Sequence, residues 1–154
     1  MSICFTVDGD YGFLSNFYNC SFSYRGLTYT SSEAAWQAQK CRSEEEKKKF
    51  TMKTPAQAKT AGRRVKLRPD WEAVKYTLMV EVCYQKFIQN PTLREKFLAT
   101  GEAEIIEDTT GWHDNLWGQC SCSKCKIKNG GEKGQNLLGK ALMEVRKKIR
   151  EENQ

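Results

Sequence analysis

The chain has 154 residues, of which 39% are apolar and 29% charged, and this is the composition of a globular protein rather than a disordered or fibrous one. No apolar run approaches the roughly 20 residues that a membrane-spanning helix needs, and the N-terminal sequence MSICFTVDGD lacks the apolar core of a secretion signal, so we expect a cytoplasmic protein with no membrane partner. The net charge of +6 favours anionic partners, although an excess of this size does not by itself establish nucleic-acid binding.

The first part of the chain predicts three short strands and two helices. Apolar and polar side chains alternate in the strands, and Arg25-Gly26 provides the turn of a hairpin. Thr54 followed by proline marks the start of the second helix. In chain order, we expect strands at residues 3–7, 22–24 and 27–29, and helices at residues 31–40 and 54–62.

The second part is dominated by helices. The strongest one covers residues 70–89 and stops at Asn90-Pro91, and its apolar stripe consists of Trp71, Val74, Leu78, Val82 and Phe87. A short helix up to Thr100, a strand at residues 103–107 and a last helix with a buried stripe follow, and that stripe consists of Leu138, Leu142, Val145 and Ile149. Together these elements predict a predominantly helical α+β fold with a few short strands, in a single domain over residues 1–154.

The helix expected over residues 31–40 places three functional groups on one face. Glu33, Gln37 and Lys40 stand at i, i+4 and i+7, so a carboxylate, an amide and an amine share one stripe. Alanines around them keep the helix slim enough to approach a ligand closely. The alternative is a capping box, in which Glu33 only reaches back to the backbone at Thr30 to satisfy an N–H at the helix start.

The longest irregular segment covers residues 108–135 and is interpreted as a binding loop. It presents Asp114 between two tryptophans, and its end, rich in glycine and lysine, leads into the last helix. Free N–H groups at that helix N-terminus suit a phosphate. The alternative makes Asn136 an ordinary N-cap, with the glycines only turning the chain.

Seven cysteines make an odd number and are scattered along the chain, which favours reduced thiols over a disulfide framework. Three of them cluster as Cys120-x-Cys122-x-x-Cys125. Three thiolates suit zinc, but a closed site needs a fourth ligand, and zinc ribbons show paired knuckles where this chain has one cluster. We therefore expect no metal, passive loop cysteines, and a local hydrogen-bonding role for His113, the single histidine.

A series of short motifs runs through the chain in a recognisable order and spacing. They are SNF at 15–17, SSEAAWQAQK at 31–40, Gly62-Arg63, the Trp71 helix with KF at 86–87, Thr100-Gly101, Asp114-x-x-Trp117-Gly118, and GQNLLGKALMEVR at 134–146. Jointly they resemble the NADAR (YbiA-like) family from about residue 10 to residue 150. The cysteine-bearing insertion after Gly118 departs from the shortest family pattern, in which a glycine-rich turn joins these elements directly.

The resemblance implies an N-glycosidase that needs no metal or other cofactor. Two substrate classes are associated with the family: ADP-ribose attached to guanine bases in nucleic acid, and phosphoribosylated pyrimidine intermediates of riboflavin synthesis. Both reactions break a bond between ribose C1 and a nitrogen through a state of oxocarbenium character, which needs negative charge near C1 and neutralisation of the leaving nitrogen. The basic balance of the chain favours ADP-ribosylated guanine in nucleic acid.

Three residues are expected to carry this chemistry. Glu33 is expected to orient the ribose and transfer a proton, Asp114 to stabilise the cationic sugar, and Lys40 to act as a nucleophile through a Schiff base or as a phosphate contact. The resemblance also places further residues at the substrate: the stacking rings Phe17 and Trp117, the hydrogen-bonding side chains Asn16 and Gln37, and Trp36, Arg63, Trp71, Gly118, Gly134 and Asn136.

Two other classes of function stay open at this point. A pure binding module for NAD or ADP-ribose would use the same pocket without turnover, although it would not need Glu33, Lys40 and Asp114 together, since buried charges cost desolvation. A zinc-stabilised nucleic-acid adaptor would instead use the cysteine cluster and the lysines at 124, 126, 128 and 133. The oligomeric state is open as well.

Overall fold

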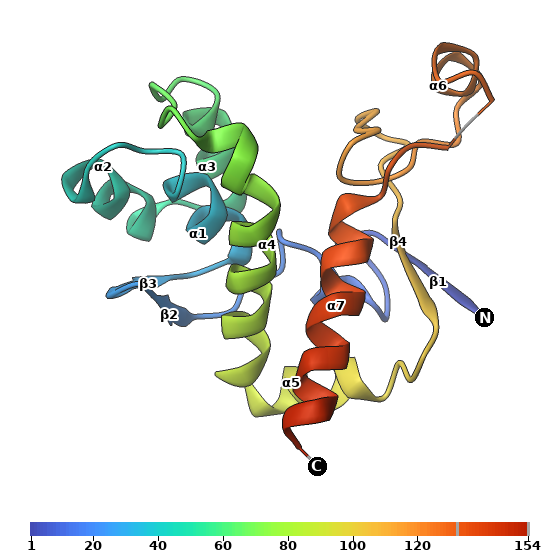
Figure 1. Ribbon diagram of the computed structural model, residues 1–154, viewed down its shortest axis with the longest axis horizontal. Coiled ribbons are helices and arrows are strands. Elements are labelled where there is room, and N and C mark those ends of the chain that lie inside the picture. Colours follow the sequence, from blue (N-terminus) through green and yellow to red (C-terminus); the bar gives the residue numbers. More distant parts are fainter. Residues whose placement is uncertain (132, 154) are drawn as a thin grey trace. The chain divides into compact units, whose positions relative to one another are not determined.

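The computed structural model describes residues 1–131 and 133–153 (Figure 1). The chain folds as two compact units. Unit 1 consists of Met1–Ser15 and Leu98–Gln154, and unit 2 is the continuous segment Asn16–Phe97. Helices account for more residues than strands in each unit.

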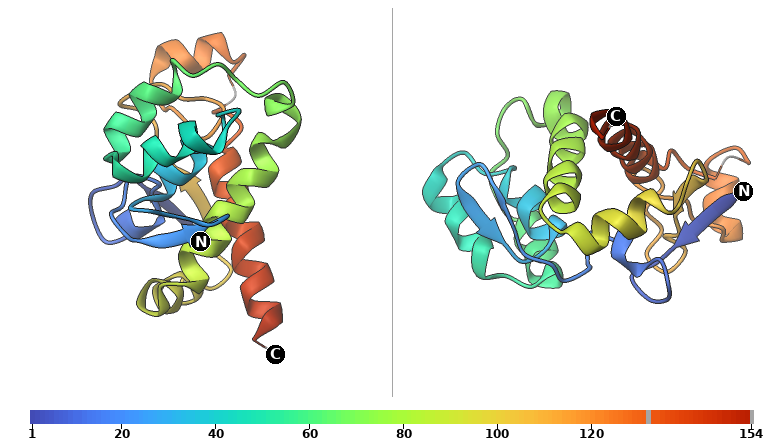
Figure 2. Two further views of the ribbon diagram at one scale, coloured as in Figure 1. Left: turned by 90° about the vertical axis from the view of Figure 1, so that its left-hand side faces the viewer. Right: turned by 90° about the horizontal axis from the view of Figure 1, so that it is seen from below.

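Unit 2 is a set of helices beside one β-hairpin. The antiparallel hairpin pairs Phe22 with Tyr29 and packs against the long helix α4, which Figure 2 shows in two further views. In chain order the unit contains β2 (Phe22–Tyr24), β3 (Leu27–Tyr29), α1 (Ser32–Ala38), α2 (Glu44–Lys48), the 3-10 helix η2 (Lys49–Met52), α3 (Pro55–Gly62), α4 (Trp71–Ile88) and α5 (Pro91–Leu98), whose last residue belongs to unit 1.

Small side chains let α1 pack tightly against α3 and α4. Ala34, Ala35 and Ala38 of α1 are fully buried. Gly62 ends α3 beside α1, and a Cβ atom at that position would overlap the side-chain amide oxygen of Gln37. This close approach fixes the position of the polar side chains on α1.

The other helices of unit 2 follow their sequence signals. Thr54 and Gln57 form a reciprocal capping box at the start of α3, with Pro55 in its first turn. The side-chain amide of Gln89, which caps α4, donates to the Ser23 carbonyl and accepts from the Ser23 N–H, both at 2.7 Å, so α4 is tied to the hairpin. The helix buries most of the expected stripe, namely Trp71, Leu78, Val82 and Phe87.

Unit 1 contains two parallel strands and a long helix. β1 (Ser2–Phe5) pairs with β4 (Glu104–Glu107) in parallel, so that Ile3 lies opposite Ile105. α7 (Leu137–Glu152) contacts β4, and the guanidinium of its Arg146 donates to the Ala103 carbonyl at 2.8 Å. The remaining elements are the 3-10 helix η1 (Gly12–Leu14) and the six-residue helix α6 (Ser123–Lys128).

These elements confirm the expected fold class, a predominantly helical α+β fold with short strands. The sequence analysis missed α2 and α6, because both are short and neither carries an apolar stripe; α2 buries none of its residues. No helix among the described residues is long and apolar enough to cross a membrane. All seven cysteines are free thiols, as expected.

Candidate functional site

The start of α1 decides between the two interpretations of Glu33. Ser31 is the N-cap, and its hydroxyl accepts the backbone N–H of Ala34 at 3.1 Å. The Thr30 hydroxyl instead donates to the Lys53 carbonyl. The alternative of a capping box between Thr30 and Glu33 is therefore wrong, because the cap lies one residue later and Ser31 fills it.

Glu33 is buried within unit 2, with 8% of its surface exposed. The side-chain amide of Gln37, one turn further along α1, donates to its Oε2 at 3.4 Å. Gln37 is itself held in place by its contact with Gly62. The Gln37 side chain thus lies between the Glu33 carboxylate and the backbone of Gly62.

Lys40 lies two residues beyond the end of α1, with its amine over two aromatic rings. Its Nζ is 5.2 Å from the centroid of the Trp36 ring and 5.7 Å from that of Trp71, and these two rings contact each other in a tilted arrangement at 5.0 Å. Burial lowers the pKa of Lys40; the Glu33 carboxylate opposes this effect, and the positive charges of Arg63 and Lys75 add to it. The arrangement gives a half-buried amine whose pKa is influenced by the charge of a buried carboxylate.

Asn16 and Phe17 lie at the start of unit 2. The Asn16 side chain accepts the Ser32 hydroxyl at 2.8 Å, and its backbone carbonyl accepts the Glu33 N–H at 3.0 Å. These bonds anchor the first turn of α1, so Asn16 positions Glu33. The ring of Phe17 lies 5.8 Å from the ammonium of Lys59.

In unit 1, Asp114 organises a turn in the long loop. Its Oδ1 accepts the backbone N–H groups of Leu116 and Trp117, each at 2.9 Å, and its carbonyl accepts the Thr109 hydroxyl at 2.6 Å. The carboxylate therefore has a structural role as the hydrogen-bond acceptor of this turn. The expected catalytic role is a second role of the same side chain.

The same turn occupies the N-terminus of α7. The N–H groups of Leu137 and Leu138 donate to the carbonyls of Leu116 and Trp117, both at 3.0 Å. These two groups are consequently taken by the protein itself. The expectation that this end of α7 offers its free N–H groups to a phosphate is corrected accordingly.

Asn136 is the residue before α7, and its side chain does not cap the helix. Its amide donates to the Ile105 carbonyl at 2.8 Å and accepts the Glu107 N–H at 3.0 Å, which ties α7 to β4. The alternative of an ordinary N-cap is thus wrong. Gly118 and Gly134 are needed for close packing, since a Cβ atom at either position would overlap neighbouring backbone. Substrate contacts by these residues stay predictions.

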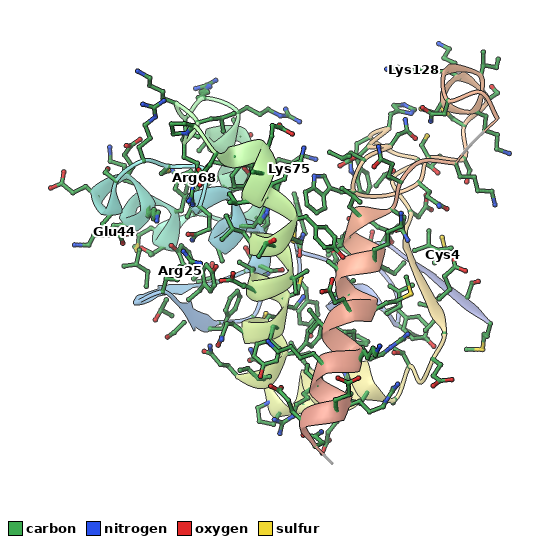
Figure 3. All side chains as sticks on the ribbon, in the orientation of Figure 1. Cys4, Arg25, Glu44, Arg68, Lys75 and Lys128 are labelled. Atoms are coloured by element: carbon green, nitrogen blue, oxygen red, sulfur yellow. The ribbon has the colours of Figure 1, made fainter. Side chains whose placement is uncertain are left out.

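The predicted site residues divide between the two units. Glu33 and Lys40 interact with each other inside unit 2, and their surroundings include Lys75 on α4, labelled in Figure 3, which the sequence analysis missed because nothing in its spacing distinguishes it. Unit 2 also contains Asn16, Phe17, Trp36, Gln37, Arg63 and Trp71. Unit 1 contains Asp114, Trp117, Gly118, Gly134 and Asn136.

A separate cavity of about 830 Å³ lies in unit 2 beside η2 and α3. None of the predicted catalytic residues lines it. Glu33 and Lys40, which lie outside the lining of this cavity, supply a buried acid and a half-buried amine. The charged residues that line the cavity are Glu46, Lys49, Lys53, Arg64 and Lys66.

In unit 1, four side chains that can bind a metal ion come together: His113, Cys120, Cys122 and Cys125. The sequence analysis recognised the three cysteines but assigned His113 only a local hydrogen-bonding role. In the structure, the Nδ1 atom of its ring lies close to the sulfur atoms of all three cysteines.

Comparisons of sequence and structure show which known proteins this chain is similar to. Residues 4–150 match the sequence model of the NADAR domain family. The chain is 35% identical over 148 residues to the N-glycosidase YbiA of Escherichia coli, which covers 94% of this chain and 86% of that protein. It is 34% identical over 147 residues to a riboflavin biosynthesis protein of Vibrio vulnificus, covering 94% of this chain but only 37% of that longer protein. The fold is similar to the NMR structure of the E. coli protein YbiA, with a TM-score of 0.82, 34% identity, and coverage of 99% of this chain and 89% of that one.

Proposed function

The chain belongs to the NADAR family of N-glycosidases, and we propose that it removes ADP-ribose from guanine bases of nucleic acid by hydrolysing the bond between ribose C1 and a nitrogen of the base. The observation that carries the proposal is a buried carboxylate, Glu33, whose charge acts on a half-buried amine, Lys40. Relatives named N-glycosidases support the class of reaction. The choice of ADP-ribosylated nucleic acid as the substrate is inferred from the positive charge of the chain and of the cavity beside η2 and α3.

Glu33 is the proposed proton-transfer group. When the C1–N bond breaks, its electrons leave with the nitrogen while C1 gains positive charge, so protonation of that nitrogen lowers the barrier. A carboxyl group that is buried and held by the Gln37 amide can deliver a proton in a fixed direction. The same group then takes a proton from the water that completes hydrolysis.

Lys40 is the proposed nucleophile. Its lone pair attacks C1, the electrons of the C1–N bond leave with the protonated nitrogen, and the ribose ring opens to an imine that water hydrolyses. Burial over Trp36 and Trp71 lowers the pKa of Lys40, and this raises the neutral, reactive fraction of the amine at a given pH.

Borohydride added during turnover is expected to trap a covalent sugar adduct on Lys40, because reduction turns the imine into a stable secondary amine. Peptide mass spectrometry locates the adduct. The part of the pH–rate profile that reports the amine is also expected to rise with pH, with a midpoint below the ordinary lysine pKa of about 10.4, since only the neutral amine attacks. Intact turnover with no adduct on Lys40 would leave direct attack by water as the mechanism.

The preference for a nucleic-acid substrate rests on the cavity beside η2 and α3. Four of its five charged lining residues are basic, and Glu46 is the acidic one. A nucleic acid extends beyond the modified base, and its phosphates gain from such cations through counterion release. A free modified nucleoside lacks these neighbouring backbone phosphates.

The test compares ADP-ribosylated guanosine with the same modified base inside an oligonucleotide. The double change Lys49→Ala and Arg64→Ala is expected to lower kcat/KM several-fold for the oligonucleotide only, because phosphate contacts are lost. Lys96→Ala, an exposed lysine of the same unit outside the cavity, is the matched control. Equal loss on both substrates, or turnover of neither, would contradict the proposal.

A second candidate substrate class is the phosphoribosylated pyrimidine intermediates of riboflavin synthesis. The observation that favours it is the similarity to the Vibrio riboflavin biosynthesis protein. The bond broken and the proposed roles of Glu33 and Lys40 are the same for both classes. Incubation with these intermediates, followed by detection of released ribose phosphate, separates the two candidates.

A further inference from the structure

The loop of unit 1 gathers one histidine and three cysteines at a single point. The Nδ1 atom of His113 lies 3.2 Å from the sulfur of Cys120, 3.4 Å from that of Cys122 and 3.5 Å from that of Cys125. All four potential ligand atoms lie within 4.8 Å of one another. Cys120 and Cys125 are buried, whereas His113 is exposed at the edge of the cluster.

The distances from His113 to the three sulfur atoms fit a tetrahedral zinc ion. Zn–S bonds of about 2.3 Å and Zn–N bonds of about 2.1 Å place the edges of the tetrahedron at about 3.6 Å between nitrogen and sulfur. Each measured distance from His113 to a sulfur is within about 0.4 Å of that edge. Four protein ligands leave no open position, which is the pattern of a structural zinc site rather than a catalytic one.

The backbone holds the ligands in this arrangement. His113 has a φ of 59°, in the left-handed region that residues other than glycine rarely adopt, and its N–H donates to the Thr109 carbonyl at 2.7 Å. Cys122 is the N-cap of α6, and its sulfur accepts the N–H of Cys125 at 3.4 Å. A helix N-terminus of this kind stabilises a thiolate, the form that binds a metal.

The short helix α6 has no apolar anchor apart from this cluster. Cys125 is its one buried residue, and Ile127 is 81% exposed. A six-residue helix is not stable in water by itself, because helix nucleation is unfavourable. The lysines of α6 point to solvent as well, with Lys128 labelled at its end in Figure 3. Bonds from a metal ion to Cys122 and Cys125 would anchor this helix to the loop that precedes it.

We propose that His113, Cys120, Cys122 and Cys125 bind one zinc ion, which fastens α6 and the surrounding loop of unit 1. Binding converts three thiols into thiolates and releases three protons, while the neutral imidazole coordinates through Nδ1 and keeps its proton on Nε2. A set of three sulfur atoms and one nitrogen in tetrahedral geometry is typical of zinc. The assignment of these four ligands is argued from their geometry and does not rest on the proposed N-glycosidase activity.

Metal analysis of protein purified under reducing conditions without chelators tests this directly. The wild type is expected to contain one zinc ion per chain, and Cys122→Ser, Cys125→Ser and His113→Ala are each expected to lose most of it. Cys4→Ser is the matched control, because it removes an exposed thiol of the same unit outside the cluster. It is expected to keep its zinc.

A second measurement uses the wild type, so it does not depend on whether the variants fold. Removal of zinc with a strong chelator is expected to expose the peptide bonds after Lys124, Lys126 and Lys128 to trypsin, and added Zn²⁺ is expected to restore their protection. Co²⁺ added to the metal-free, reduced protein is expected to give the visible absorption of a tetrahedral thiolate site.

Three results would overturn the proposal. The first is wild-type protein without zinc that takes up none when Zn²⁺ is added after reduction. The second is zinc that survives all three cluster substitutions or is lost equally from Cys4→Ser, which would identify an adventitious ion only. The third is a disulfide between cluster cysteines in protein that has never been exposed to oxidant.

Discussion

Glu33→Gln is expected to lower turnover at least about 100-fold, the lower end for loss of a positioned proton-transfer group, with little change in melting temperature. Glutamine keeps the size of the side chain and an oxygen that can accept the Gln37 amide. The cap of α1 is untouched, because Ser31 provides it. The ability to give and take a proton is removed, together with the charge that acts on Lys40. Initial rates and thermal unfolding of the same samples measure the effects on turnover and stability.

The matched control is Glu44→Gln, which changes an exposed glutamate in the first turn of α2. Its ion pair with Lys47 lies at the surface, where such pairs contribute little. Activity and stability should therefore both be kept. If Glu33→Gln instead retained turnover and lost about 1 kcal/mol of stability, Glu33 would be a structural residue of the helix start.

Asp114→Asn is expected to abolish cleavage while substrate binding is largely kept. The asparagine side chain retains a carbonyl oxygen that can accept the N–H groups of Leu116 and Trp117, so the turn before α7 persists. What is lost is the negative charge, which favours a cationic transition state over the neutral ground state. Turnover and the calorimetric affinity for substrate are the two measurements.

Asp114→Ala separates the structural role of this side chain from the chemical one. It removes the acceptor of both N–H groups, so we expect a loss of about 1 kcal/mol of stability, as for a lost helix cap, in addition to the loss of turnover. If Asp114→Asn were as active as the wild type and Asp114→Ala were unstable, the residue would serve only the turn.

Much of the fold could be predicted from the sequence, because the signals were local. The hairpin at β2 and β3, the proline-marked start of α3 and the apolar stripe of α7 all depend on neighbours within a few residues. The parallel pairing of β1 with β4 could not be predicted. It joins segments about a hundred residues apart, and nothing in either strand specifies its partner.

Part of the candidate site could also be predicted from the sequence. The stripe of Glu33, Gln37 and Lys40 follows from helical spacing, although Lys40 lies just beyond the helix end. The role of Asn136 could not be read from the sequence, since its bonds to Ile105 and Glu107 depend on how α7 packs on β4.

The gathering of His113 with the three cysteines could not be predicted from their spacing. Zinc ribbons are recognised by paired knuckles, and His113 stands outside that pattern, seven residues before Cys120. Its left-handed backbone turns the ring toward the three sulfur atoms, and such a conformation is not encoded in a spacing rule. A long loop with few apolar residues and several cysteines was the available signal.

The most direct test of hydrolysis at ribose C1 is the mass of both products formed in water labelled with heavy oxygen. Cleavage between C1 and the nitrogen leaves that nitrogen on a guanine that stays in the nucleic acid, so we predict an oligonucleotide with unlabelled guanine and free ADP-ribose from the wild type, and neither from Glu33→Gln. A base that had lost its nitrogen and taken up labelled oxygen would place the cleavage on the other side of that nitrogen. Binding of ADP-ribose with no product from either substrate class would make the protein a binding module and contradict the account.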